Sequence, residues 1–178
     1  MFKEILDEIM LYEPKTKKNN EIIILVGLPG SGKDTFLTEN SLRDSHTIIS
    51  RDDELVKYCE GNNIKGTYNE QWKLLSDAEH KIIDNNTYSN FIAAVKNKEN
   101  IIINQTNMSV KSRRKWLANV GKDYNKNCIL FQVSLDKVID RNKKRDGKTI
   151  SKGILFSMMK GFKYPSYDEF DNISIVTK

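Results

Sequence analysis

The chain has 178 residues, of which 38% are hydrophobic and 30% are charged, and its formal net charge is +5. This length is enough to bury one sizeable core and is short for two independent domains. No apolar run approaches the roughly 20 residues of a membrane span, and the opening MFKEILDEIM carries acidic residues that a secretory signal avoids. We therefore expect a soluble, cytoplasmic protein without a membrane partner. The only cysteines, Cys59 and Cys128, are far apart, which favours buried, neutral thiols over a disulfide or a zinc site.

Basic residues are concentrated in one part of the chain. Residues 111–152 contain 13 Lys and Arg against 4 Asp, a local balance of +9, so the rest of the chain sums to −4. Such a stretch is typical either of a surface that handles phosphates or of a solvated helix face. The acidic run DEFD at residues 168–171 is expected to be a solvated entry to the last strand, without a metal.

Short apolar runs alternate with helical patterns along the chain. The runs predict strands at residues 22–26, 47–49, 101–103, 128–133 and 173–176. A helix is expected at residues 33–40. Apolar residues at helical spacing mark further helical segments and are expected to be core: Trp72, Leu75, Ala78 and Ile82; Tyr88, Phe91, Ile92 and Val95; Ile154, Leu155, Met158, Met159 and Phe162. Ser109 and Ser151 are expected to be helix N-caps.

This order of elements predicts an α/β fold. Strands that alternate with helices form a parallel sheet, here of about five strands, with helices on both faces. We expect one such domain in residues 21–178. Residues 1–20 are expected to form a short N-terminal helix followed by the polar linker KTKKNN.

Residues 27–35 read GLPGSGKDT and come directly after the first predicted strand. A strand, a glycine-rich turn that ends in Gly-Lys, and a following helix are the context of the phosphate-binding loop (P-loop), G-x-x-x-x-G-K-[ST]. In such a loop the backbone N–H groups hold the β-phosphate, and the lysine neutralises the β and γ oxygens. The dinucleotide pattern G-x-G-x-x-G does not match. The expected ATP-binding residues here are Gly27, Leu28, Pro29, Gly30, Ser31, Gly32, Lys33, Asp34 and Thr35.

Asp34 occupies the position where the P-loop normally has a hydroxyl that reaches Mg²⁺. A second carboxylate usually follows another strand in this fold, but the strand at residues 101–103 is followed by Asn104 and Gln105. Our hypothesis is that the carboxylate has moved into the loop, so that Asp34 and Thr35 hold the metal. Mg²⁺ keeps several waters and needs only one or two protein oxygens. The alternative is that Asp34 caps the helix.

Residues 47–54 read TIISRDDE and place Asp52 at the carboxyl end of a predicted strand. Open α/β sheets bind their ligands at this edge. Phosphoryl transfer to an alcohol needs a carboxylate within hydrogen-bond reach of the attacking hydroxyl, so we predict that Asp52 is the general base. Arg51 beside it is predicted to contact a substrate phosphate, and Asp53 is the candidate cap of the next helix.

A basic segment, RNKKRDGKTISKG, occupies residues 141–153. Arg141 and Arg145 are four residues apart, so on a continuing helix they would point the same way. Two guanidinium groups on such a segment suit a lid that closes over the polyphosphate and stabilises charge in the transition state. A solvated helix face is the alternative.

Four pieces in this order carry a family resemblance: GLPGSGK, ISRDD, QTNMSVKSRRKWL and VIDRNKKR. From about residue 22 to residue 175 the chain resembles the kinase domain of the bacteriophage polynucleotide 5′-kinase/3′-phosphatase family. The resemblance implies an adenylate-kinase-like P-loop kinase fold that transfers the γ-phosphate of ATP, with Mg²⁺, to the 5′-hydroxyl of DNA or RNA. It also suggests a phage-infected bacterium as the setting.

The same resemblance assigns roles to particular residues. It implies Asp52 as the base, Lys33 as the loop lysine, and Arg145 as the lid arginine at the transferring phosphate, with Arg141 beside it. It also places Thr106, Asn107, and Arg113 or Arg114 at or beyond the acceptor site.

Three departures from the family pattern keep other functions open. Asp34 replaces the loop serine, Gln105 replaces the acid that follows the strand, and Leu55 replaces an arginine that grips the acceptor's 3′-phosphate. The phosphatase half with its D-x-D motif is absent from this sequence. The prediction is a polynucleotide 5′-hydroxyl kinase that acts on single-stranded or end-exposed DNA or RNA. A kinase for a hydroxymethylated base, a nucleoside or nucleotide, or a small molecule stays open, as does an ATP-binding module without catalysis. A homo-oligomer is also compatible with the sequence.

Overall fold

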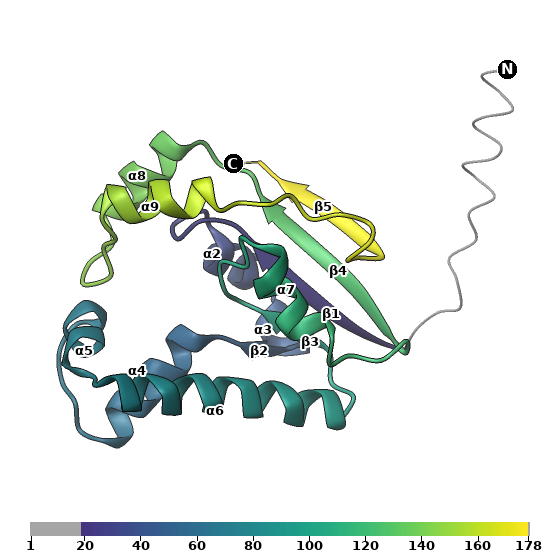
Figure 1. The fold of residues 1–178 in the computed structure, drawn as a ribbon, viewed down its shortest axis with the longest axis horizontal. Helices are drawn as coiled ribbons and strands as arrows, with labels where there is room; N and C mark the ends of the chain where they lie inside the picture. The colour runs from purple at the N-terminus through teal and green to yellow at the C-terminus, as the bar shows by residue number, and fades with distance from the viewer. Residues whose placement is uncertain (1–18, 178) are drawn as a thin grey trace, which may run out of the picture.

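The structure, a computed structural model, describes residues 19–177 (Figure 1). The N-terminal helix and linker are predicted at residues 1–20, of which residues 1–18 lie outside the described part of the chain. Asn20, the last residue of the predicted linker, already belongs to the first strand. The strands are β1 (Asn20–Val26), β2 (Thr47–Ile49), β3 (Ile101–Ile103), β4 (Tyr124–Phe131) and β5 (Asn172–Val176). They form one parallel sheet in the order β2-β3-β1-β4-β5, which confirms the predicted α/β fold.

The sheet is built around the central strand β1, whose apolar residues are buried. Its apolar run is buried on both sides, as a parallel strand between two neighbours requires. β3 pairs with its middle, from Ile22 opposite Ile101 to Ile24 opposite Ile103, and β4 pairs with its whole length, from Asn20 opposite Tyr124. This long pairing with β1 makes β4 begin four residues before its apolar run, in a polar stretch that does not look like a strand by itself.

Helices cover both faces of the sheet. They are α2 (Lys33–Glu39), α3 (Leu42–Ser45), α4 (Arg51–Gly61), α5 (Tyr68–Leu74), α6 (Asp77–Lys96), α7 (Val110–Leu117), α8 (Leu135–Lys143) and α9 (Lys152–Lys160). On one face Ile22 and Ile24 pack with Phe91 of α6 and Trp116 of α7. On the other face the alternate residues of β1 pack with Leu37 of α2 and with Leu42 of α3. The alternation of side chains along β1 therefore supplies both cores.

Two of the predicted apolar stripes differ from what the structure shows. The stripe that begins at Trp72 is not one helix, because α5 ends at Leu74 and Ser76 caps α6 in a capping box with Glu79. Trp72 and Ile82 are consequently exposed instead of core. In α9 only Leu155 is fully buried. The predicted N-caps are confirmed, since the side chains of Ser109 and Ser151 accept hydrogen bonds from the N–H groups of Ser112 and Ile154.

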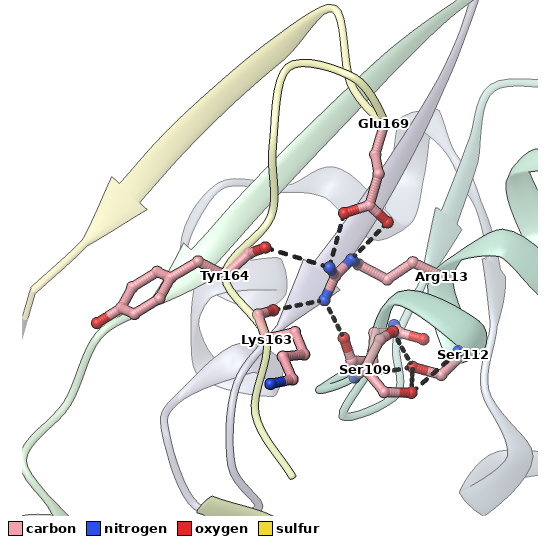
Figure 2. A network of polar contacts seen from close by, with 7 residues as sticks. Ser109, Ser112, Arg113, Lys163, Tyr164 and Glu169 are labelled. Carbon is pink, nitrogen blue, oxygen red and sulfur yellow. Dashed lines mark hydrogen bonds and ion pairs between the residues drawn. The ribbon is translucent and has the colours of Figure 1, made fainter.

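The segment between α9 and β5 is fixed by a buried ion pair (Figure 2). The guanidinium of Arg113, on α7, donates to both carboxylate oxygens of Glu169, at 3.0 and 2.7 Å. It also donates to the backbone oxygens of Asn107, Lys163 and Tyr164. The acidic run at residues 168–171 is therefore not a solvated entry to β5, because Glu169 and Phe170 are turned into the protein.

Both cysteines are free and buried, as predicted. Burial raises the pKa of the Cys128 thiol to about 12, so this thiol stays neutral. Within residues 19–177, no helix combines the length and the apolar character that crossing a membrane requires.

Candidate active site

A cleft of about 1300 Å³ lies at the carboxyl ends of the strands. Open α/β sheets place their ligands at this edge because loops from several strands converge there. The cleft is lined by the P-loop, the start of α4, the helix α5, the loop that follows β3, and the segment that joins α8 to α9, together with Arg43 of α3. Figure 1 shows that this last segment reaches from α8 and α9 toward α5.

The P-loop turns sharply between β1 and α2. Gly32 has φ +99°, a conformation that side chains rarely adopt, so glycine is required where the loop enters the helix. The amine of Lys33 is buried and donates to the backbone oxygens of Gly27 and Leu28, at 2.9 Å each. Burial lowers the pKa of Lys33 to about 8; Asp34 opposes this shift and Arg145 adds to it. Within residues 19–177 this buried ammonium forms its hydrogen bonds with neutral backbone oxygens, so it is poised to bind an anion.

Asp34 contacts Asn104, the residue that directly follows β3. The side-chain amide of Asn104 donates to Asp34 Oδ1 at 2.7 Å, and Arg43 lies 3.6 Å from the same oxygen. Gly32 is the N-cap residue of α2, and no side chain caps this helix, so the alternative role of Asp34 as a cap is not what the structure shows. The carboxylate therefore connects the P-loop to the segment after β3, one residue before Gln105, the position at which the resemblance implies an acid.

The two predicted Mg²⁺ ligands, Asp34 and Thr35, offer one carboxylate and one hydroxyl. Asp34 and Thr35 line the cleft side by side, next to Lys33. Among residues 19–177 there is no group of three or more His, Cys, Asp or Glu that could hold a metal by itself. This donor set suits Mg²⁺, which retains several waters and takes further oxygens from a bound phosphate.

Asp52 lies in the first turn of α4, with both carboxylate oxygens in use. The hydroxyl of Tyr68 donates to Oδ1 at 2.7 Å, and the ammonium of Lys148 lies 2.6 Å from Oδ2. Burial alone would raise the pKa of Asp52, but Lys148 and Tyr68 together outweigh it and hold this pKa below the ordinary value. Asp52 is therefore ionised near neutral pH and able to accept a proton.

The start of α4 differs from the prediction in one detail. Ser50 is the N-cap and accepts the backbone N–H of Asp53, so Asp53 is not the cap. Arg51, the neighbour of Asp52, contacts residues of α6 and α5. It donates through Nε to Asp84 at 2.5 Å, and its guanidinium lies 4.4 Å from the centre of the Trp72 ring. Its Nη1 atom is buried and has no partner within the described part of the chain.

The predicted lid carries its two arginines into the cleft, although not on one helix. α8 ends at Lys143, so Arg145 lies beyond it. Arg141 lies above the P-loop, with its Nη1 3.7 Å from the position of a Cβ on Gly32. Arg145 lines the cleft, and its buried Nη1 has no partner among residues 19–177. An unpaired buried donor of this kind is what an incoming phosphate would satisfy.

The lid is held at its base and at its tip. At the base, the side chain of Asn142 exchanges hydrogen bonds with the backbone of Ile150. At the tip, Asn69 of α5 donates its backbone N–H to Gly147 at 2.8 Å and its side-chain amide to Thr149 at 3.0 Å. The contact at the tip requires glycine, because a Cβ on Gly147 would lie 2.6 Å from the Thr67 side chain.

Several residues that the resemblance placed near the acceptor lie elsewhere. Thr106 lines the cleft, but the side chain of Asn107 is buried and donates to the backbone oxygen of Leu25. Arg113 is the buried partner of Glu169. Arg114 lines a separate, smaller hollow of about 400 Å³ between α7 and the segment before β5. One turn of α7 therefore directs neighbouring arginines away from the cleft.

The cleft residues that were not predicted include Tyr68, Trp72 and Lys148. Lys148 was part of the basic segment, but no pattern in the sequence indicates that it reaches Asp52. Tyr68 and Trp72 come from α5, whose only local signal, the capping box of Thr67 and Glu70, marks a helix start and not a site.

A P-loop lysine, an ionised carboxylate and lid arginines around one cleft at the strand ends define a P-loop phosphotransferase domain. The family described as AAA domain matches residues 22–163, and the chain belongs to this family.

The comparison with curated proteins gives a viral relative. The protein named "Putative bifunctional polynucleotide kinase/RNA ligase" from Autographa californica nuclear polyhedrosis virus is 29% identical over 150 residues. The match covers 82% of this chain and 21% of the relative, so this chain spans about a fifth of that protein.

Solved structures give the same fold. A chain of the Pnkp1/Rnl/Hen1 RNA repair complex matches with a TM-score of 0.66 and 26% identity, over 89% of this chain and 48% of the other. A gluconokinase from Sinorhizobium meliloti 1021 matches with a TM-score of 0.52 and 13% identity, over 90% of this chain and 84% of the other. The predicted P-loop kinase fold and the resemblance to polynucleotide kinases are confirmed.

Proposed function

We propose that this chain is a polynucleotide 5′-hydroxyl kinase that transfers the γ-phosphate of ATP to a 5′-OH end of DNA or RNA. The observation that carries the proposal is that Lys33 and Asp52, from different strand ends, line one cleft. The similarity to a viral polynucleotide kinase/RNA ligase and to a chain of an RNA repair complex supports a nucleic-acid acceptor.

On the donor side, the P-loop amides and Lys33 bind the phosphates. Lys33 exchanges its two backbone oxygens for phosphate oxygens, which restores a counter-charge to its buried ammonium. Arg145 and Arg141, from the lid, supply further positive charge. Arg145 stabilises the charge that develops on the transferring group, because it lines the cleft and its Nη1 donor has no partner among residues 19–177.

Mg²⁺, held by Asp34 and Thr35, would neutralise the charge of the triphosphate when it is bound. The hydrogen bond from Asn104 orients the Asp34 carboxylate for this purpose. Asp34 replaces the family's loop hydroxyl, and Gln105 replaces the family's acid after the strand. One carboxylate is therefore kept in this region.

On the acceptor side, Asp52 accepts the proton of the 5′-hydroxyl. The hydroxyl oxygen then forms a bond to the γ-phosphorus, the bond from this phosphorus to the β–γ bridging oxygen breaks, and ADP leaves with that oxygen. Both oxygens of Asp52 are occupied in this structure, by Tyr68 and by Lys148. Because Lys148 belongs to the lid, we propose that it withdraws when the acceptor hydroxyl binds, while Tyr68 stays and orients the carboxylate.

Other residues of the cleft are placed to contact the acceptor strand. Thr106 and Arg51 line the same cleft as Asp52 and are proposed to contact the acceptor strand. Leu55, at the position of the family's phosphate-binding arginine, is fully buried and contributes no such contact. The charge of the lid must then supply part of the affinity, so binding of a polynucleotide should weaken as salt rises.

The proposed function is tested by phosphate transfer from γ-labelled ATP to a panel of acceptors. The panel contains 5′-OH oligonucleotides of DNA and RNA, the same strands with 5′-phosphates, mononucleosides, gluconate, and a base-hydroxymethylated duplex with blocked ends. Label on the 5′-OH strands alone supports the proposal.

A second candidate is transfer to another hydroxyl, which the structural likeness to a gluconokinase keeps in view. Label on gluconate, on a nucleoside or on the blocked duplex, with unlabelled 5′-OH strands, would establish that function instead. Binding of ATP without transfer to any acceptor would indicate a module that has lost catalysis.

A further inference from the structure

Trp72 is an unusual residue for the wall of a phosphate cleft. It is 42% exposed, although tryptophan is the largest aromatic side chain, and it lines the same cleft as Asp52 and Lys33. The only other tryptophan of the chain, Trp116, is 1% exposed and belongs to the core. Trp72 therefore presents an exposed aromatic surface within the cleft, and such a surface is available for stacking with a ligand.

The ring of Trp72 is held in position by its neighbours. The guanidinium of Arg51 lies 4.4 Å from the ring centre, and the ring of His80 lies 4.6 Å from it. His80 also contacts Arg51 at 3.2 Å and the backbone oxygen of Trp72 at 3.1 Å. Asp84 fixes Arg51 from α6. The exposed ring is therefore preorganised, and a ligand that stacks on it does not have to order it first.

Two pairs of residues connect α4 to α5 in parallel. Asp52 is bonded to Tyr68, and the adjacent Arg51 lies over Trp72. Tyr68 and Trp72 are four residues apart on α5, so they lie on one face of the helix, one turn from each other. The ring centres of Tyr68 and Trp72 are 6.1 Å apart.

We infer that Trp72 is the stacking platform for the base of the acceptor's 5′-terminal nucleotide, when its 5′-hydroxyl is at Asp52. The inference rests on the proposed function. It assigns to Trp72 the selection of a polynucleotide 5′ end over a sugar acceptor that has no base. Stacking on an aromatic ring tolerates every base because each has a π face, so the site accepts ends of any sequence. The guanidinium of Arg51, which lies over the same ring, adds a cation to the platform.

The test compares two 5′-OH oligonucleotides that differ only at the first position, which carries a normal base in one and an abasic tetrahydrofuran sugar in the other. For the unmodified protein, the abasic end should raise KM by about 5-fold to 100-fold and leave kcat nearly unchanged. In Trp72→Ala, KM for the normal end should rise to that of the abasic end, and the difference between the two substrates should disappear. Trp72→Phe should retain part of the difference in KM between the two substrates.

Leu74→Ala is the matched control. Leu74 is on the same helix and is 67% exposed, but it does not line the cleft. This variant should keep the KM values of the unmodified protein. A second readout is independent of catalysis: binding of the normal 5′-OH strand should quench the fluorescence of Trp72, and Trp72→Phe, which leaves only the buried Trp116, should lose this response.

The outcomes separate the two proposals. Equal KM values for normal and abasic ends in an active, unmodified protein overturn the inference and leave the proposed function standing. A rise in KM for Trp72→Ala that is the same for both ends assigns Trp72 to the sugar or to the fold, and also overturns it. Absence of transfer to any 5′-OH end overturns the proposed function and this inference with it.

Discussion

Replacing Glu169 with glutamine would leave the guanidinium of Arg113 buried without an opposing charge. The Arg113 side chain is 0% exposed and that of Glu169 is 8% exposed, and the ion pair is bidentate. Breaking one side of a buried pair costs about 3–5 kcal/mol of unfolding free energy. Because three backbone oxygens would still accept from Arg113, we expect the low end of this range.

For a domain of this size, a loss of about 3 kcal/mol corresponds to a fall in Tm of about 6–12 °C. Thermal unfolding followed by circular dichroism measures it, with urea unfolding to give the free energy directly. The control is Asp140→Asn, which removes the exposed pair of Asp140 and Lys143 and should cost less than about 0.5 kcal/mol. If Glu169→Gln and Asp140→Asn proved equally mild, the reasoning that Arg113 depends on the carboxylate would be refuted.

Further predictions concern the cleft. Asp52→Asn should lower the rate of transfer on the order of 10²-fold or more while calorimetry shows unchanged ATP binding; loss of ATP binding would mean that Asp52 is structural. In Lys148→Met, burial should raise the pKa of Asp52 once its ammonium partner is gone, so the acid limb of the kcat/KM profile should move to higher pH, and a stationary limb would contradict this. Lys33 is charged below its pKa of about 8, so affinity for ATP should fall as pH rises through this value, whereas Lys33→Arg should show no such fall. Asp34→Ser should raise the Mg²⁺ concentration needed for half-maximal rate; a lower requirement would count against a carboxylate that has moved into the loop.

The sheet and the P-loop were predictable because their signals are local. A buried parallel strand has a continuous apolar run, and the glycines and lysine that follow β1 have fixed spacing. Asp52 was predictable for the same reason, since it follows the short run of β2. Each of these residues is placed by the strand that precedes it, so the sequence order alone brings Lys33 and Asp52 to one edge of the sheet.

The rest of the site depends on contacts between segments that are distant in sequence. Lys148 meets Asp52 across 96 positions of the chain, and Arg113 meets Glu169 across 56. No local pattern encodes such pairs. The apolar residue Trp72 was predicted to be core because its spacing fits a helix, but the capping box at Ser76 divides that helix and leaves Trp72 at the cleft. Periodicity predicts a helix face and does not distinguish a buried face from one kept open for a ligand.

The hydrogen bonds from Asn69 to the lid tip have a consequence for turnover. In a kinase built as proposed, α5 forms the acceptor wall and also anchors the segment that covers the nucleotide. Detachment of Gly147 and Thr149 from α5 would uncover the bound nucleotide and the acceptor strand at once. ADP and the phosphorylated strand would then leave after the same step. If this detachment is the slowest step of the cycle, kcat is the same for every phosphorylated strand that leaves.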